Sequence, residues 1–293
     1  MPQATDTETS SKTIALLQLL EDESPMVRSA VSQALRSLNM DIIQFARERR
    51  IPLSDAQHAA LDSIFWDRHR QELLQAWEAW LEEEEGPVKL EKALHLLSHL
   101  QNGTRPRPSL SMALNELTDR FSLDDGPATP AALARFLFDG LSFTAIPEGS
   151  ESSDGINVSL VVERRHGLPV SLVCIYILLG HRLGFDITGC NWPGSYYARY
   201  REDGVLYLVD FSNHGSVSTM DELLRLQGPS RAAAESVITL DMTASMLVRR
   251  ITSKLALYYR REGNAKNSML TVELLRALDR RIQQPDANNT AIC

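Results

Sequence analysis

The chain has 293 residues, 43% hydrophobic and 23% charged, so its length suggests about two domains and its composition allows a substantial core. Its formal net charge of −8 disfavours binding to nucleic acid or to an anionic membrane, because both need a basic surface. Its three cysteines, with no Cys-x-x-Cys pair, predict neither a disulfide framework nor a zinc ribbon.

Residues 1–11 are polar and are expected to form a disordered tail. They carry no secretory signal, and the longest apolar run, 170–179, is about half of a membrane span, so a cytoplasmic location without membrane attachment is expected. Apolar stripes at 16–20 and 27–35, joined by a turn at 22–25, predict two packed helices. This pair resembles one HEAT-type repeat, in a helical region expected to span residues 12–86.

Helical patterns continue toward the middle of the chain. One long helix is expected over residues 55–84, ending in four glutamates that Gly86-Pro87 terminates. Because glutamates oppose the helix dipole there, the interpretation is a solvated, fraying end. Further helices are expected at 88–100, 110–121 and 131–140, followed by a polar loop at 147–155.

The segment ERRHGLPVSLVCIYILLGHRLG, residues 163–184, predicts a central helix that begins at Pro169 and is apolar on every face, hence buried. Three short runs follow and predict an antiparallel meander: 187–192, 196–200 and 205–210. Helices then resume at 220–226, 244–262 and 268–282. The expected fold class is therefore α+β and mostly helical, a buried helix with a short antiparallel sheet, flanked by helical hairpins.

This order of helix and strands resembles the transglutaminase-like superfamily, and the segments VVERRHGLPVSLVCIYILLGHRLGF, CNWPGSYYARY and YLVDF are similar to its SirB-type branch. The resemblance implies a transglutaminase-like domain at 87–240. Residues 241–283 resemble one tetratricopeptide-type hairpin, and residues 284–293 are expected to be a second disordered tail.

In that superfamily a cysteine at the helix start, a histidine on the next strand and an aspartate on the following strand form a catalytic relay. The cysteine position, two residues after Gly167, is Pro169, as is common in the SirB-type branch. The histidine position is Ser195, which departs even from that branch, and only the acid, Asp210, is retained. Without sulfur and imidazole these positions cannot perform relay catalysis. The resemblance thus implies a non-catalytic protein-interaction or regulatory module with unidentified protein partners.

An enzyme with a relocated site is the alternative hypothesis. A hydrolase or peptidase would need Ser171 or Cys174 as nucleophile and His166 or His214 as base. Cys174 lies among apolar residues, and burial raises the pKa of a thiol, so an inert core cysteine is expected. The Ser171 hydroxyl is expected to form a structural hydrogen bond.

Three further features remain as interpretations. Arg164 and Arg165, which follow Glu163, either pair with carboxylates such as Asp210 or Asp186, or line the cleft and bind an acidic partner or ligand. His95 and His99 share a helix face, but no third ligand is identifiable, so no metal and no cofactor are expected. A smaller possibility is that the loop at 147–155 covers a small-ligand cleft beside Asp210.

Overall fold

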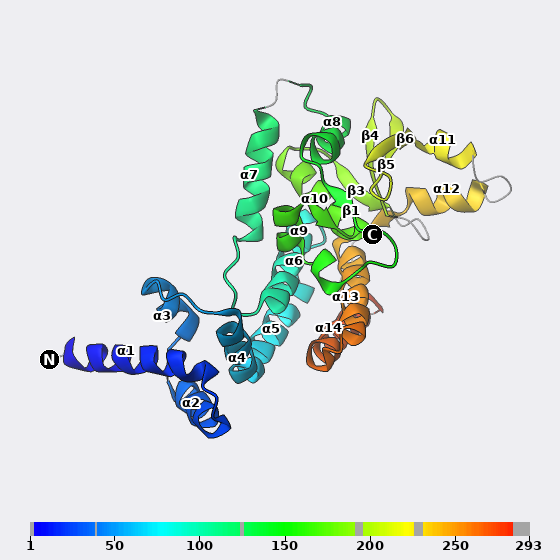
Figure 1. Cartoon of the computed structure of the whole chain (residues 1–293). Coiled ribbons are helices and arrows are strands. Elements are labelled where there is room, and N and C mark those ends of the chain that lie inside the picture. The colour runs from blue at the N-terminus through cyan, green and yellow to red at the C-terminus, as the bar shows by residue number, and fades with distance from the viewer. Residues whose placement is uncertain (1–2, 39, 124–125, 191–195, 226–230, 284–293) are drawn as a thin grey trace. The chain divides into compact units, whose positions relative to one another are not determined.

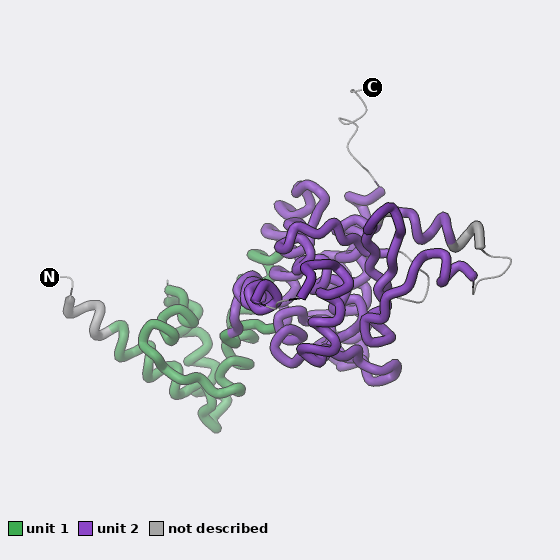
Figure 2. Tube along the Cα trace, turned by 90° about the horizontal axis from the view of Figure 1, so that it is seen from above, with its two compact units in different colours: residues 1–73, 102–106 green, residues 74–101, 107–293 purple. Residues whose placement is uncertain are grey.

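The computed structural model describes residues 3–38, 40–123, 126–190, 196–225 and 231–283 (Figure 1). The chain divides into two compact units: residues 1–73 with 102–106, and residues 74–101 with 107–293 (Figure 2). The division assigns the second half of helix α5, Trp66–Leu81, and nearly all of α6, Pro87–Asn102, to the larger unit, so its boundary lies ahead of the one expected at residue 86.

The smaller unit consists of helices around one apolar cluster. Leu17, Leu20, Leu35 and Leu61 are almost fully buried in it. The helices are α1 Gln3–Gln18, η1 Leu19–Glu21, α2 Pro25–Ser37, α3 Ile42–Glu48 and α4 Asp55–Ile64. The prediction of a disordered tail at 1–11 is wrong from residue 3 onward, because helix α1 begins at Gln3. No proline or glycine interrupts the sequence between Pro2 and Pro25, so nothing stops the helix from extending toward its N-terminus.

The long helix expected at 55–84 is two helices in the structure, α4 and α5 Trp66–Leu81. The backbone at Phe65 leaves the helical region, with φ −100° and ψ 10°. The guanidinium of Arg36 donates a hydrogen bond of 3.1 Å to the carbonyl of Ile64 at this break. A partner from α2 thus satisfies a carbonyl beside the break, and the sequence pattern of α4 and α5 contains no sign of it.

The glutamates after α5 are not a fraying end. Lys89 pairs with Glu85 at 3.1 Å and Lys92 with Glu83 at 2.5 Å, both from α6, Pro87–Asn102. Arg281 pairs with Glu82 at 3.0 Å. Cations from two other helices therefore fix three of the four carboxylates, which offsets their unfavourable position at a helix C-terminus.

Helix α10, Pro169–Arg182, is the centre of the larger unit, and every residue from Val170 to Gly180 is buried. This confirms the buried central helix predicted from the sequence. Its helical neighbours include α7 Leu110–Ser122, α8 Pro130–Arg135 and α9 Val158–Arg164, and α8 continues into the π-helix η2 Phe136–Gly140. The hydroxyl of Tyr176 on α10 donates a hydrogen bond of 2.8 Å to the carbonyl of Pro130.

A five-stranded antiparallel sheet, in the order β6-β5-β4-β3-β7, packs against α10. It contains the predicted meander as β3 Ile187–Cys190, β4 Tyr197–Glu202 and β5 Val205–Asp210. The strands β6 Ser216–Thr219 and β7 Asp241–Met242 were not predicted, because one is polar and the other has two residues. A separate parallel pair joins β1 Thr144–Ala145 to β2 His166–Gly167, immediately before α10.

Helices complete the larger unit: α11 Met220–Arg225, α12 Arg231–Thr239, α13 Ala244–Arg261 and α14 Ala265–Gln283. The last two form a hairpin, and Gly263 between them has a φ of 75°. The structure is mostly helical with small sheets, which confirms the expected fold class. In the described part of the chain, no helix has the length and apolar character required to cross a bilayer.

Candidate functional site

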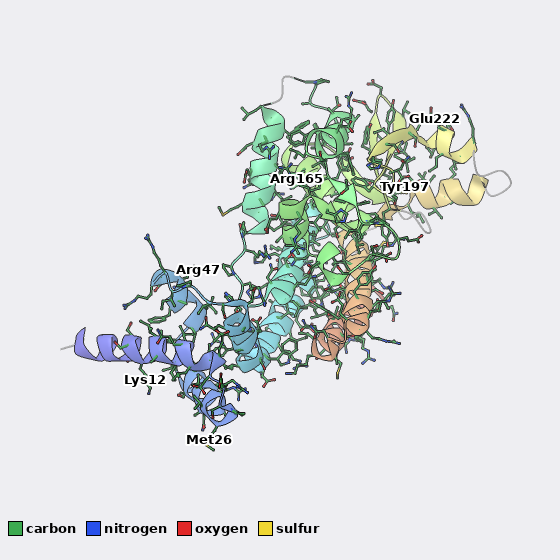
Figure 3. The ribbon with its side chains drawn as sticks, viewed as in Figure 1. Lys12, Met26, Arg47, Arg165, Tyr197 and Glu222 are labelled. Atoms are coloured by element: carbon green, nitrogen blue, oxygen red, sulfur yellow. The ribbon has the colours of Figure 1, made fainter. Side chains whose placement is uncertain are left out.

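The structure describes two of the three positions that would form the catalytic relay. Pro169 is the first residue of α10, and Asp210 is the last residue of β5. Asp210 lies opposite Tyr197, the first residue of β4, in the antiparallel register. Tyr197 is labelled in Figure 3. Ser195, at the histidine position, lies outside the described residues, so that assignment stays a prediction.

The main chain of a preceding turn is hydrogen-bonded to the start of α10. The carbonyl of Gly155, in the 3-10 turn η3 Ser153–Gly155, accepts a hydrogen bond of 2.9 Å from the N–H of Leu168 and another of 2.9 Å from the hydroxyl of Ser171. Ser171 is fully buried. Its hydroxyl is therefore committed as a donor to a peptide carbonyl, and no described base accepts its proton.

The loop at 147–155 is fixed on several sides near its end. The carboxylate of Glu262, after α13, accepts hydrogen bonds from the N–H and the hydroxyl of Ser153, at 2.8 and 2.7 Å. The amide of Gln101 donates to the carbonyl of Ser153 at 2.8 Å. Asp154 pairs with Arg164 at 3.0 Å. These contacts hold Gly155 against the start of α10.

Cys174 is completely buried in the core of the larger unit. Burial raises the pKa of its thiol far above the usual range, so the sulfur stays protonated at neutral pH. Cys190 is also buried, in an apolar cluster with Leu206, Leu208 and Ile238. Neither environment activates a thiolate.

The two candidate bases lie at different places. His166 is exposed on β2, and its Nδ1 is 2.8 Å from the hydroxyl oxygen of Thr144. His214 has a left-handed backbone, with φ 50°, in the turn after β5, and it lines a cavity of about 290 Å³ with Arg135 and Asp139. Within the described ranges, no hydrogen bond links either imidazole to Ser171, Cys174 or Asp210.

The carboxylate of Asp210 holds a turn. Its Oδ1 accepts a hydrogen bond of 2.9 Å from the N–H of Ser212, and its own carbonyl accepts from the N–H groups of Asn213 and Gly215. Gly215 has a φ of 66°, and a Cβ there would lie 2.2 Å from the ring of Phe138. The retained acid therefore stabilises the connection from β5 to β6.

The charged segment before α10 contacts partners that the sequence did not suggest. Glu163 pairs with Arg107 at 2.5 Å. Arg164 pairs with Asp154, and Arg165 donates a hydrogen bond of 3.1 Å to the carbonyl of Leu141. Arg164 therefore pairs with a carboxylate, as one of the two interpretations expects, but the carboxylate is Asp154 and not Asp210 or Asp186, because α9 ends beside the loop that carries Asp154.

Sequence reasoning missed a cationic and aromatic cluster on α13, which packs against Tyr196, the residue after Ser195. The guanidinium of Arg250 and the ammonium of Lys254 lie 5.5 and 5.6 Å from the centre of the Tyr196 ring. Burial lowers the pKa of Lys254, but the oxygens of Tyr196 and Tyr258 raise it more, so the net shift is upward and Lys254 stays protonated. Nothing local in the sequence signals this cluster, because Tyr196 and Lys254 are far apart along the chain.

The described parts of the chain contain no group of three histidine, cysteine or acidic side chains that could hold a metal ion. His95 lines a second cavity, on α6, which is treated separately below.

Comparison with known proteins adds the following findings. A family model described as the transglutaminase-like superfamily matches residues 107–255. UPF0162 proteins from two strains of Xylella fastidiosa, Temecula1 and 9a5c, are 31% identical over 97 residues, which is 33% of this chain and 34% of theirs. A UPF0162 protein from Vibrio cholerae is 32% identical over 90 residues, 30% of this chain and 33% of its own. The chain thus spans about a third of the length of these relatives, and no solved structure matches it.

Proposed function

This chain belongs to the transglutaminase-like superfamily, and we propose that it is a non-catalytic member that acts as a protein-interaction or regulatory module. The observation that carries this proposal is that no available nucleophile lies at the start of α10 among the described residues. Pro169 occupies the position of the family cysteine, and the carbonyl of Gly155 binds the N–H of Leu168 and the hydroxyl of Ser171 there.

The alternative, a hydrolase or peptidase with a relocated site, has less support. It requires Ser171 or Cys174 to be activated by His166 or His214. The hydroxyl of Ser171 donates to a main-chain carbonyl, and burial keeps the thiol of Cys174 protonated. A nucleophile needs a base within hydrogen-bond reach, and the described residues provide none for either group.

We place the chain in the SirB-type branch, as a cytoplasmic protein, with residues 12–86 as a HEAT-like region and residues 241–283 as a tetratricopeptide-like hairpin. Support comes from the motif Glu163-Arg164-Arg165, which lies where the branch carries it, just before the central helix. Helical repeats of both kinds bind other proteins through their concave faces. Partner binding through these helices therefore fits a domain without a catalytic relay.

The proposed contact surface for an acidic partner consists of Arg164 and Arg165. The side chains of Arg164 and Asp154 are 55% and 63% exposed, and exposed pairs contribute only about 0–1 kcal/mol. An acidic segment of a partner can therefore displace Asp154 at little cost. Among the described residues, the guanidinium of Arg165 donates only to the carbonyl of Leu141, so it keeps further donors for a carboxylate.

Two measurements test the proposal. Treatment of the native protein with iodoacetamide near neutral pH should leave the peptide containing Cys174 unmodified, whereas the unfolded protein should react. Quantitative affinity capture should recover partners with the wild type that the double variant Arg164→Glu/Arg165→Glu loses, and Arg225→Glu, an exposed arginine on α11, is the matched control. Selective native labelling of Cys174 would favour an enzyme. Identical partners with wild type and double variant would remove Arg164 and Arg165 from the contact surface.

A further inference from the structure

A cavity of about 640 Å³ lies in the larger unit, and neither Pro169 nor Asp210 is among its described lining residues. Its walls are one face of α5, one face of α6, the first turn of α7 and Arg182 at the end of α10. Pockets that bind small molecules have volumes of about 300–1,000 Å³ and mostly apolar walls with a few polar groups. The volume of this cavity therefore suits a small-molecule ligand.

The cavity wall is largely apolar. Ala76, Ala79 and Trp80 contribute from α5, and Val88 and Leu96 contribute from α6. Val88 is 55% exposed, so it presents apolar surface that a ligand could cover. The indole N–H of Trp80 donates to the carbonyl of Lys89 at 2.8 Å, so its polar atom is satisfied without a ligand. The alanines leave the space that larger side chains would fill.

The charged groups of the wall neutralise one another. Glu83 pairs with Lys92 at 2.5 Å. Both carboxylate oxygens of Glu91 accept hydrogen bonds from Arg182, at 2.7 and 2.8 Å. A charged ligand that disrupted the pair of Glu91 and Arg182, whose side chains are only 22% and 15% exposed, would leave a largely buried charge without its partner, which is costly. The electrostatics therefore favour an uncharged ligand.

One polar side chain of the wall has no partner of its own. His95 makes no hydrogen bond to any described residue, and its neutral imidazole offers one donor and one acceptor. It can orient a ligand that carries a single hydroxyl, amine or carbonyl group.

We propose that this cavity binds an uncharged, apolar small molecule, aromatic or alicyclic, with one hydrogen-bonding group that contacts His95. This site is independent of the protein-interaction or regulatory function proposed above. A partner helix lying between α5 and α6 is the competing occupant, and the experiment below distinguishes the two.

The test uses two fluorescent probes that differ by one sulfonate, N-phenyl-1-naphthylamine and 8-anilino-1-naphthalenesulfonate, titrated into the full-length chain. The uncharged probe should bind saturably, and the sulfonate should bind about tenfold more weakly or worse. Ala79→Phe, at an exposed alanine of the wall, should weaken binding of the uncharged probe by about tenfold. Ala265→Phe, at an exposed alanine outside the cavity, is the control and should leave binding unchanged.

A second variant keeps the test decisive if Ala79→Phe disturbs folding. Val88→Gln changes an exposed side chain of the wall and should also weaken binding of the uncharged probe. Leu257→Gln, at an exposed position on α13, should leave this binding unchanged. Equal affinity for both probes, or binding that neither wall variant changes, would overturn the proposal. No saturable binding at all would also overturn it, and would favour the partner helix.

Discussion

The carbonyl of Gly155 and the hydroxyl of Ser171 are joined by a hydrogen bond of 2.9 Å at the first turn of α10. This contact links a loop to the helix whose start would carry the nucleophile in an active relative. The hydroxyl that would be the best substitute for the missing thiol is thereby part of the scaffold.

Ser171→Ala should therefore lower stability and change no catalytic property. The carbonyl of Gly155 would keep only its bond from Leu168, and the loss of one buried hydrogen bond costs about 1 kcal/mol. Urea denaturation should show a lower midpoint with an unchanged slope. The control is Ser122→Ala, which removes an exposed hydroxyl that also donates to a main-chain carbonyl, and a loss as large as that of Ser171→Ala would contradict the prediction.

Gly155→Ala should destabilise the protein more than Ser171→Ala. A Cβ at this position would lie 2.4 Å from Cδ1 of Ile146 and 3.2 Å from Cγ of Leu168, and overpacking of a buried site costs about 1–3 kcal/mol. Gly126→Ala is the matched control, because a Cβ there meets nothing within 4 Å. Thermal unfolding of the two variants measures the difference, and equal melting temperatures would show that the loop can move away from α10.

The sequence was sufficient for the parts of the fold that local pattern determines. α10 is apolar on every side, which predicts that it is buried. β3, β4 and β5 are short apolar runs separated in the sequence by residues typical of turns. The short helix α9 was missed because its seven residues lie between a polar loop and a charged run. The break at Phe65 was missed because a distant arginine, Arg36, stabilises it.

For the candidate site, the sequence predicted only those features that depend on the identity and local surroundings of a single residue. The absence of sulfur at Pro169 is visible in the sequence, and so is the apolar setting of Cys174. The partner of Arg164 and the position of Lys254 against Tyr196 depend on how distant segments pack, and a single sequence carries no pattern for such contacts.

Glu85 should contribute an acid-sensitive part of the stability. Burial alone would raise its pKa, but the hydroxyl and N–H of Ser245 and the ammonium of Lys89 donate to its carboxylate and bring the pKa below its usual value near 4.5. Because the folded pKa is lower than the unfolded pKa, this stabilisation is present above about pH 4.5 and is lost as the pH falls through the folded pKa.

The variant Glu85→Gln should therefore be less stable than the wild type at neutral pH, by about 1 kcal/mol after allowance for its partial exposure, and the difference should shrink as the solution is acidified. Melting temperatures between neutral pH and about pH 3 measure this. Glu84→Gln removes an exposed neighbouring carboxylate and should show no such convergence. A difference independent of pH would mean that Glu85 contributes by packing and not by charge.

The final prediction concerns the position of the missing nucleophile. Pro169→Cys, alone or with Ser195→His, should keep the fold, because Pro169 is the first residue of α10 and only half-buried. Loss of the proline should cost about 1 kcal/mol through the greater freedom of the unfolded chain. The introduced thiol would lie at the N-terminus of a 14-residue helix, where the helix dipole favours the thiolate.

Alkylation by iodoacetamide as a function of pH tests this prediction. The introduced thiol should react much faster than the buried Cys174, and its reactivity should rise at a lower pH than that of the control Ser212→Cys, an exposed position after β5. A circular dichroism spectrum like that of the wild type, together with thiol reactivity that rises at a lower pH than in the control, would show that the N-terminus of α10 remains accessible and stabilises a thiolate. If the thiol were as inert as Cys174, then the carbonyl of Gly155 and its loop would block the site even with a thiol in place, and the loop as well as the proline would prevent thiol chemistry there.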